Sequence, residues 1–225
     1  MIGSPRVHLR LADSTNERAR ALAAAGAPHG TLVTADEQRA GRGRQGRSWT
    51  APPRSAVLMS VVLRDLRETL PLAAAVAVCE ALPLDAAIKW PNDVWIGGRK
   101  VAGILVEARP QEGWAVLGIG LNVSTREFPP PLDATATSLA REGVSISTED
   151  ALAALLAALE GWLERPMREV LAAWRERDAL HGRTVRWANG SKEGTAAGVD
   201  AAGALIVDTP EGTVTLDAGE VHLQR

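Results

Sequence analysis

A nine-residue stretch, Gly41–Trp49, holds the densest group of residues in this chain that could do chemistry. It reads GRGRQGRSW, in which three glycines alternate with three arginines and no acidic residue intervenes. Glycine lets the backbone approach a ligand closely and adopt positive φ. Each arginine supplies a permanently charged, planar fork for carboxylate or phosphate oxygens. The stretch therefore predicts an anion-binding loop.

The glycines of this stretch also match the dinucleotide-binding pattern G-x-G-x-x-G, at Gly41, Gly43 and Gly46. That pattern needs a helix directly after it. Here the chain continues with Ser48–Pro53, which reads SWTAPP, and a double proline cannot continue a helix. A Walker-type phosphate loop is excluded as well, because no G-K-[ST] follows. Spacing alone leaves open a solvated Arg/Gly loop or an RNA-binding segment.

Lysine is rare in this chain: of 25 cationic side chains, only Lys89, Lys100 and Lys192 are lysines. Since arginine is the default cation, a retained lysine indicates a position that needs a compact ammonium. Lys89 opens KWPND, where proline and asparagine predict a turn beside Asp93. Lys100 opens KVAGILVEA, and Gly103 inside that run is typical of a bulge or of close approach to a ligand.

Apolar runs and alternation predict the elements that must position these residues. The predicted strands are Val7–Leu11, Thr31–Ala35, Ser55–Leu63, Ala87–Trp90, Val94–Ile96, Val101–Ala108 and Trp114–Asn122. Leu70–Leu82 is apolar nearly all round and predicts a buried helix. A capping-box spacing at Ser147 and Asp150 opens a helix with one apolar stripe, and a further helix runs through Trp174.

The first predicted helix follows Asp13, Ser14 and Thr15 and ends at Gly26. Asp and Ser are favoured helix caps, and a terminal glycine is a stop signal. We therefore interpret Ser14 and Thr15 first as capping residues. The same hydroxyls and free amides at a helix N-terminus can also face a ligand.

The end of the chain changes character after His181-Gly182. Five short runs are separated by tight-turn signals, and this pattern predicts a small SH3-like barrel. The runs are Thr184–Trp187, Thr195–Val199, Leu205–Asp208, Thr213–Leu216 and Glu220–Leu223. We expect a catalytic domain over residues 1–179 and a separate barrel over residues 180–225.

Bulk properties narrow the class of protein. The 225 residues carry a net charge of -2, which argues against a general nucleic-acid binder. Cys79 lies in the apolar run Ala73–Leu82, where a buried, inert thiol is expected. No signal segment opens the chain, and no apolar run is long enough to cross a bilayer. We expect a soluble, cytoplasmic protein with no membrane or nucleic-acid partner.

Several motifs, read in order, resemble those of biotin–protein ligases, that is, biotin–[acetyl-CoA-carboxylase] ligases. They are DSTN (13–16), EQRAGRGRQGRSW (37–49), KWPNDV (89–94), GRKVAGILVE (98–107) and GIGLNV (118–123). The resemblance continues into the C-terminal barrel and covers nearly the whole chain. It implies an α+β fold in which a mixed β-sheet carries helices mainly on one face, like class II aminoacyl-tRNA synthetases and biotin synthetases. The small SH3-like barrel follows.

The resemblance also implies a reaction in two steps. Biotin attacks the α-phosphate of ATP to give biotinyl-5′-AMP, and a lysine of a biotin carboxyl carrier domain then takes the acyl group. ATP and Mg²⁺ are the implied cofactors, with Asp93 as a possible Mg²⁺ ligand and no certain metal site. A homodimer paired through a sheet edge is a further expectation from relatives.

By resemblance, particular residues take particular roles. The implied catalytic residues are Arg44, Lys100 and Asp93. Biotin binding falls to Ser14, Thr15, Asn16, Gln38, Gly41, Arg42, Gly43, Arg44, Lys100 and Gly103. ATP binding falls to Arg44, Arg47, Trp49, Lys89, Asn92 and Asn122. Asp93 has an alternative interpretation as a residue that only stabilises its turn.

Other functions stay open at this stage. A lipoate–protein ligase shares the acceptor-lysine chemistry but has no GRGRxGRxW loop and needs no groups to bind a ureido ring. A biotin-binding homologue without activity and a non-enzymatic RNA-binding module are the remaining alternatives. Two features depart from the family. The motifs begin at Asp13, so no DNA-binding module is expected before them, and Ala51–Val57 replaces a glycine-containing segment at the rim of the biotin pocket.

Overall fold

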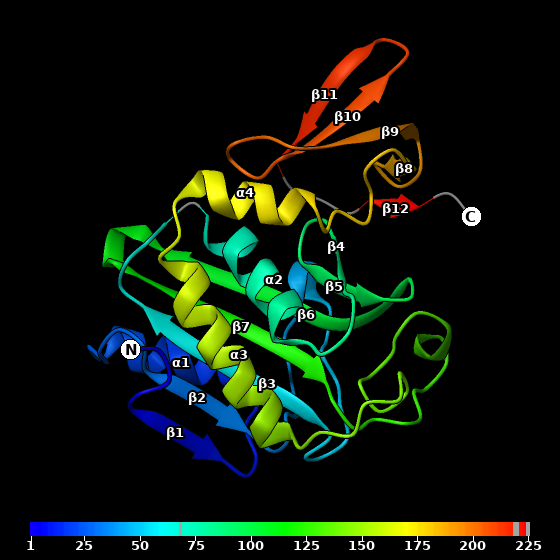
Figure 1. The fold of residues 1–225 in the computed structure, drawn as a ribbon. Helices are drawn as coiled ribbons and strands as arrows, with labels where there is room; N and C mark the ends of the chain where they lie inside the picture. Colours follow the sequence, from blue (N-terminus) through cyan, green and yellow to red (C-terminus); the bar gives the residue numbers. More distant parts are fainter. Residues whose placement is uncertain (68, 218–220, 224–225) are drawn as a thin grey trace.

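Two β-sheets and four α-helices form the structure, a computed structural model that describes residues 1–67, 69–217 and 221–223. The larger sheet and the helices lie together, and the smaller sheet stands at one end of them (Figure 1). The fold is therefore the α+β arrangement that the sequence predicts.

The larger sheet has seven strands in the order β1-β2-β3-β7-β6-β5-β4. Their bounds are β1 Arg6–Leu9, β2 Leu32–Ala35, β3 Ala56–Leu63, β4 Ala87–Lys89, β5 Asp93–Ile96, β6 Arg99–Arg109 and β7 Trp114–Asn122. β1 and β2 run parallel and the other neighbours antiparallel, so the sheet is mixed. All eight residues of β3 are buried, as a valine-rich central strand predicts.

Helices cover the two faces of this sheet unequally (Figure 1). The helices α2 (Leu70–Ala81) and α3 (Thr148–Leu163) lie on one face, and α4 (Met167–Arg175) packs against α2. The helix α1 (Thr15–Ala24) packs on the other face through Ala19 and Ala23. Of the described helices only α1 lies on this second face, and the candidate site lies beside it.

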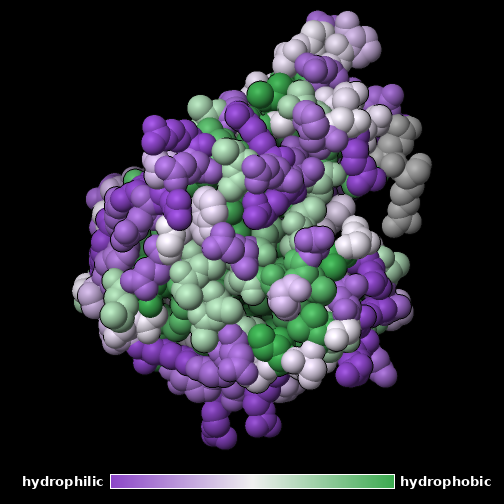
Figure 2. All heavy atoms as spheres, in the orientation of Figure 1, coloured by the Kyte–Doolittle hydropathy of each residue, from purple (hydrophilic) through white to green (hydrophobic). Residues whose placement is uncertain are grey.

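The helical layer follows directly from its sequence. Nine residues of α2 are buried, because small apolar residues of the helix itself, mainly alanine and valine, occupy all of its sides. The α3 helix begins as predicted: Ser147 Oγ accepts the Asp150 amide at 3.0 Å. In the view of Figure 2, apolar residues show among hydrophilic ones over this layer.

The smaller sheet is antiparallel, in the order β11-β10-β9-β8-β12, consistent with a small barrel. Its strands are β8 Thr184–Trp187, β9 Lys192–Val199, β10 Leu205–Thr209, β11 Gly212–Leu216 and β12 His222–Leu223. Glu220, predicted to open the last strand, lies outside the described residues. The Trp90 indole N–H donates to the Gly203 carbonyl at 2.9 Å and joins this sheet to the KWPND turn.

Two local predictions need correction. Ser14 precedes α1, but its side chain makes no cap hydrogen bond, so the interpretation as a side-chain cap is wrong. The first amide of the helix, that of Thr15, donates to Gln38 Oε1 at 2.7 Å, from the segment after β2. The irregularity in β6 lies at Val101, not at Gly103, because the pairing with β5 shifts between Trp95↔Lys100 and Val94↔Ala102.

Candidate active site

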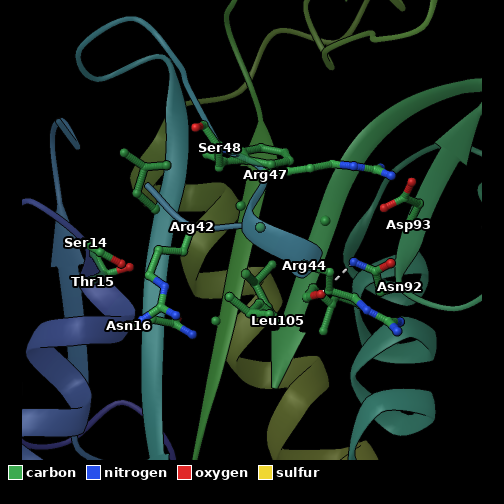
Figure 3. A pocket seen from close by; sticks show the side chains of 18 of the residues that line it. Ser14, Thr15, Asn16, Arg42, Arg44, Arg47, Ser48, Asn92, Asp93 and Leu105 are labelled. Carbon is green, nitrogen blue, oxygen red and sulfur yellow. Dashed lines mark hydrogen bonds between the residues drawn. The ribbon is translucent and has the colours of Figure 1, made fainter. Parts of the chain in front are cut away.

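A pocket opens on the α1 face of the larger sheet, above β3, β7, β6 and β5 (Figure 3). Most of the predicted site residues line it: Ser14, Thr15, Asn16, Gln38, Arg42, Gly43, Arg44, Arg47, Trp49, Lys89, Asn92, Asp93, Lys100 and Gly103. Four distant segments of the chain therefore meet at one place. Figure 3 shows Ser14, Thr15 and Asn16 on one side and Asn92 and Asp93 on the other.

The Arg/Gly loop folds back on itself over the pocket. Arg42 and Ser48 form an antiparallel bridge, and the Gly43 amide donates to the Arg47 carbonyl at 2.7 Å. A single 3₁₀ turn, η1 (Arg44–Gly46), forms its tip, where Gly46 has a φ of +76°. Glycine is required at that position because it adopts positive φ without a steric penalty.

Trp49 lies on a floor made of glycine backbone. A Cβ on Gly120 would lie 2.4 Å from Trp49 Cε2, and one on Gly103 would lie 3.0 Å from Trp49 Cζ3. These glycines therefore leave space for the protein's own indole. Among the described residues, the buried Trp49 Nε1 has no hydrogen-bond partner, so a bound ligand is the natural acceptor for this donor.

One side of the pocket is uncharged and tightly hydrogen-bonded. We call it the neutral side; it consists of Ser14, Thr15, Asn16, Gln38 and Ser60. Ser60 Oγ lies 2.8 Å from Thr15 Oγ1 and 2.6 Å from Asn16 Oδ1. Asn16 packs directly against the backbone of β7, because a Cβ on Gly118 would lie only 1.9 Å from Asn16 Oδ1. These groups are fixed in place before any ligand arrives.

The opposite side carries the charges. We call it the charged side; it consists of Arg44, Arg47, Lys89, Asp93 and Lys100. Arg42 lies across the pocket, beside Asn16 (Figure 3). Lys100 Nζ lies 2.6 Å from Asp93 Oδ1 and 5.5 Å from the centre of the Trp49 ring. Asp93 is thus a partner of Lys100 and not only a turn residue, as β5 and β6 bring Asp93 opposite Gly103.

Burial lowers the pKa of two cations on the charged side. Desolvation is the main cause for Lys89, and repulsion from Lys100 and Arg47 adds to it, while Asp93 acts in the opposite direction. The pKa of Arg44 is also lowered by desolvation. An added anion would relieve both costs, because it would add negative charge beside these buried cations.

Two predicted residues do not line this pocket. Asn122 is buried, and its amide donates to the Thr137 carbonyl at 3.0 Å. Gly41 holds the base of the loop, where its carbonyl accepts the Trp49 amide at 2.9 Å. Their roles toward ATP and biotin remain predictions.

Two polar residues that bond to the predicted site residues were not themselves predicted. Ser60 is fully buried on β3 and contacts both Thr15 and Asn16. A lone serine inside the apolar run SAVLMSVVL is the signal that could have identified it. Glu107, at the end of GRKVAGILVE, bonds Asn16 at 2.9 Å and lies 3.4 Å from Arg42. Nothing in its spacing indicated this.

The thiol lies apart from the pocket. Cys79 is buried in α2, and burial raises its pKa to about 12, so the prediction of an inert thiol is confirmed.

Within the described ranges, no group of three or more His, Cys, Asp or Glu side chains could hold a metal ion. No helix among those residues is long and apolar enough to cross a membrane.

Fold and pocket together define a class: an α+β ligase-like protein whose pocket accepts a ligand with a neutral polar end and an anionic end. The family model "Biotin/lipoate A/B protein ligase family" matches residues 9–124, and "Biotin protein ligase C terminal domain" matches residues 181–223. The chain belongs to the biotin protein ligase family.

Known relatives match over most of their length. The chain is 37% identical over 234 residues to a biotin--[acetyl-CoA-carboxylase] ligase of Mycobacterium tuberculosis, covering 94% of this chain and 86% of that protein. It is 34% identical to the bifunctional ligase/repressor BirA of Bacillus subtilis, covering 99% of this chain and 75% of that protein. The biotin protein ligase of Aquifex aeolicus, solved with biotin and ATP, superposes with a TM-score of 0.85 at 29% identity and 99% coverage of both chains.

Proposed function

We infer that this chain is an ATP-dependent biotin–protein ligase, which makes biotinyl-5′-AMP and transfers biotin to a lysine of a biotin carboxyl carrier domain. One observation carries this conclusion: a single pocket joins a neutral, prearranged hydrogen-bonding side to a side of clustered cations. Biotin has a neutral ureido ring at one end and a carboxylate at the other. The similarity to a ligase solved with biotin and ATP supports the same assignment.

In the first step, a carboxylate oxygen of biotin bonds to the α-phosphorus of ATP, and the bond to the bridging oxygen breaks to release pyrophosphate. Two anions must meet, so the step needs positive charge placed in advance. Lys100 is our candidate for the biotin carboxylate and the developing acyl-phosphate bridge. Arg44 holds the intermediate, and Arg47, Trp49, Lys89 and Asn92 bind the nucleotide.

Mg²⁺ fits this site only as a partner of the nucleotide. Asp93 is the only carboxylate among the described residues of the pocket lining, and it is already 2.6 Å from Lys100. Mg²⁺ commonly takes one or two protein carboxylates and completes its shell with phosphates and water. When bound, it would offset the charge of the phosphates.

In the second step, the amine of the acceptor lysine attacks the acyl carbon, AMP leaves, and the amine loses a proton. The loop covers the pocket and limits the access of water to the mixed anhydride. Asp93 positions the Lys100 ammonium and is our candidate to receive the proton, because it lies on the rim beside Lys100.

We place the reaction in the cytoplasm and expect no nucleic-acid partner. We also propose that two copies pair through an edge of the larger sheet, which light scattering would detect as a doubled mass.

Biotin-dependent exchange of radiolabelled pyrophosphate into ATP tests the proposal, with lipoate in parallel. We expect exchange with biotin and none with lipoate. Exchange with lipoate alone would assign the chain to the sister activity. Exchange with neither would favour a binding protein without catalysis.

A further inference from the structure

Glu107 joins three parts of the protein beside the pocket. Its side chain is only 21% exposed, although it belongs to none of the groups described so far. Glu107 Oε2 accepts from Asn16 Nδ2 at 2.9 Å, and Oε1 lies 3.4 Å from a guanidinium nitrogen of Arg20 and 3.4 Å from one of Arg42. The carboxylate therefore has one neutral contact and two cationic contacts, on different oxygens.

The contact between Glu107 and Asn16 determines which groups of the neutral side donate hydrogen bonds and which accept them. An ionised carboxylate only accepts, so Asn16 must turn Nδ2 toward Glu107 and Oδ1 toward Ser60. Ser60 has one hydroxyl proton, and it donates that proton to Asn16 Oδ1 at 2.6 Å. Its contact with Thr15 Oγ1, at 2.8 Å, then needs the proton of Thr15.

The Thr15 proton is therefore used inside the protein. It goes to Gln38 Oε1, at 3.1 Å, or, because Ser60 has given its own proton to Asn16, to Ser60 Oγ at 2.8 Å. With either acceptor, Thr15 Oγ1 can offer a ligand only lone pairs. Gln38 Oε1 also accepts the Thr15 backbone amide at 2.7 Å, which leaves Gln38 Nε2 as a donor. The neutral side thus presents an acceptor for a ring N–H and a donor for a ring carbonyl.

We propose that Glu107 is a positioning residue, which acts through Asn16 and Ser60 to make Thr15 Oγ1 an obligate acceptor and so selects ligands with a ring N–H. This inference rests on the proposed function, since it assumes that biotin occupies the neutral side. A merely structural role, as an ion-pair partner of Arg20 and Arg42, would give no such selection.

The substitution Glu107→Gln tests this role with no change of shape. Oε1 faces two cations, so the glutamine oxygen should stay there and its NH₂ should replace Oε2 against Asn16. Two donors would then face each other, and Asn16 would flip. The protons along the chain would reverse, so that Ser60 would donate to Thr15. The Thr15 proton would then no longer be needed by Ser60, and a ligand would compete for it only with Gln38 Oε1. Arg20→Gln is the matched control, because it breaks an ion pair of Glu107 and leaves the carboxylate facing Asn16.

The measurement is calorimetric binding of three probes without ATP: biotin and the two cyclic carbamates in which oxygen replaces one ring N–H. For the carbamate that the wild type rejects more strongly, we expect a preference for biotin of about 100-fold, because an unpaired buried polar group is costly. Glu107→Gln should lower that preference at least tenfold, whereas Arg20→Gln should leave it within about twofold.

The possible outcomes distinguish the positioning role of Glu107 from the proposed ligase function. An unchanged preference in a folded Glu107→Gln protein, or equal loss of all three probes in both variants, would overturn the positioning role and leave the proposed function intact. Failure of the wild type to bind biotin would overturn the proposed function and this inference with it. If Glu107→Gln does not fold, Asn16→Ala breaks the same chain and must lower the same preference.

Discussion

The neutral side and the charged side of the pocket differ in how their polar groups are satisfied. On the neutral side, Thr15, Asn16 and Ser60 are nearly fully buried and bond one another at 2.6–2.8 Å. On the charged side, burial lowers the pKa of Arg44 and Lys89, and Asp93 is the one carboxylate that the described lining residues set beside Arg44, Arg47, Lys89 and Lys100. The buried groups of the neutral side bond one another before any ligand arrives, whereas the charged side carries an excess of positive charge.

The difference matches the chemistry of the two ligand ends. A neutral ring gains little from charge and is recognised by fixed donors and acceptors, which must be arranged in advance. A carboxylate and a triphosphate bring their own negative charge, so the protein can hold an excess of positive charge on this side for them to offset. Substitutions on the two sides should therefore fail in different ways.

The largest effect is expected from Lys100→Ala. Loss of the ammonium should lower the rate of biotin-dependent pyrophosphate exchange by about 10²- to 10³-fold, because charge developing at the reacting centre loses its partner. Lys100→Arg should rescue poorly, since Lys100 Nζ already lies 2.6 Å from Asp93 Oδ1 and 5.5 Å from the centre of the Trp49 ring, and a planar guanidinium is larger than an ammonium. Lys192→Ala, in β9 of the smaller sheet, is the control. Full activity of Lys100→Arg would contradict the need for a compact ammonium.

The next effect is expected from Arg44→Gly at the tip of the loop. Removal of this cation should speed the release of biotinyl-5′-AMP about tenfold to a hundredfold. That factor corresponds to the free energy of one hydrogen bond to a charged group. Chromatography of the adenylate released during one turnover measures it. Arg39→Gly, exposed just before the loop, is the matched control. Equal retention in both variants would remove Arg44 from its assigned role.

A smaller effect, confined to the neutral side, is expected from Ser60→Ala. Asn16 Oδ1 loses its partner, so the KM for biotin should rise about tenfold while the KM for ATP stays unchanged. Pyrophosphate exchange measures both constants. Ser191→Ala, in an exposed turn between β8 and β9, controls for the loss of a hydroxyl. An equal rise in both KM values would show that the two sides are not independent.

The smallest effect concerns stability. Burial lowers the folded-state pKa of Lys89 below its ordinary value of 10.5, so its charged form destabilises the fold. That cost is fully present below the folded-state pKa and disappears as pH rises toward 10.5, because the unfolded chain then binds more protons. Lys89→Met should raise the unfolding free energy at pH 7 and lose this advantage toward pH 10.5. Urea unfolding measures it, with Lys192→Met as the control for one lost charge; a gain that persists at high pH would contradict the cause.

Much of the fold follows from local patterns. β7 has the predicted bounds Trp114–Asn122, and α2 is buried on all sides as its alanines and valines require. One error lies at the start of α1, where groups from another segment meet the helix. Ser14 was expected to cap α1, yet its side chain makes no cap hydrogen bond, and Gln38 from another segment binds the first amide of the helix. A capping propensity describes a helix in isolation and cannot include such a partner.

The sequence by itself determined the chemistry of the charged side. Arginines spaced by glycine and a retained lysine define an anion site through their charge and reach, which are properties of the residues themselves. The resemblance also named Ser14, Thr15, Asn16 and Gln38 on the neutral side, but only the tertiary structure decided how their hydrogen bonds are arranged. Ser60 belongs to this side and Glu107 contacts it because β3 and β6 lie next to β7 in the sheet. The direction of a hydrogen bond depends on which groups meet, and strand order, not residue spacing, brings them together.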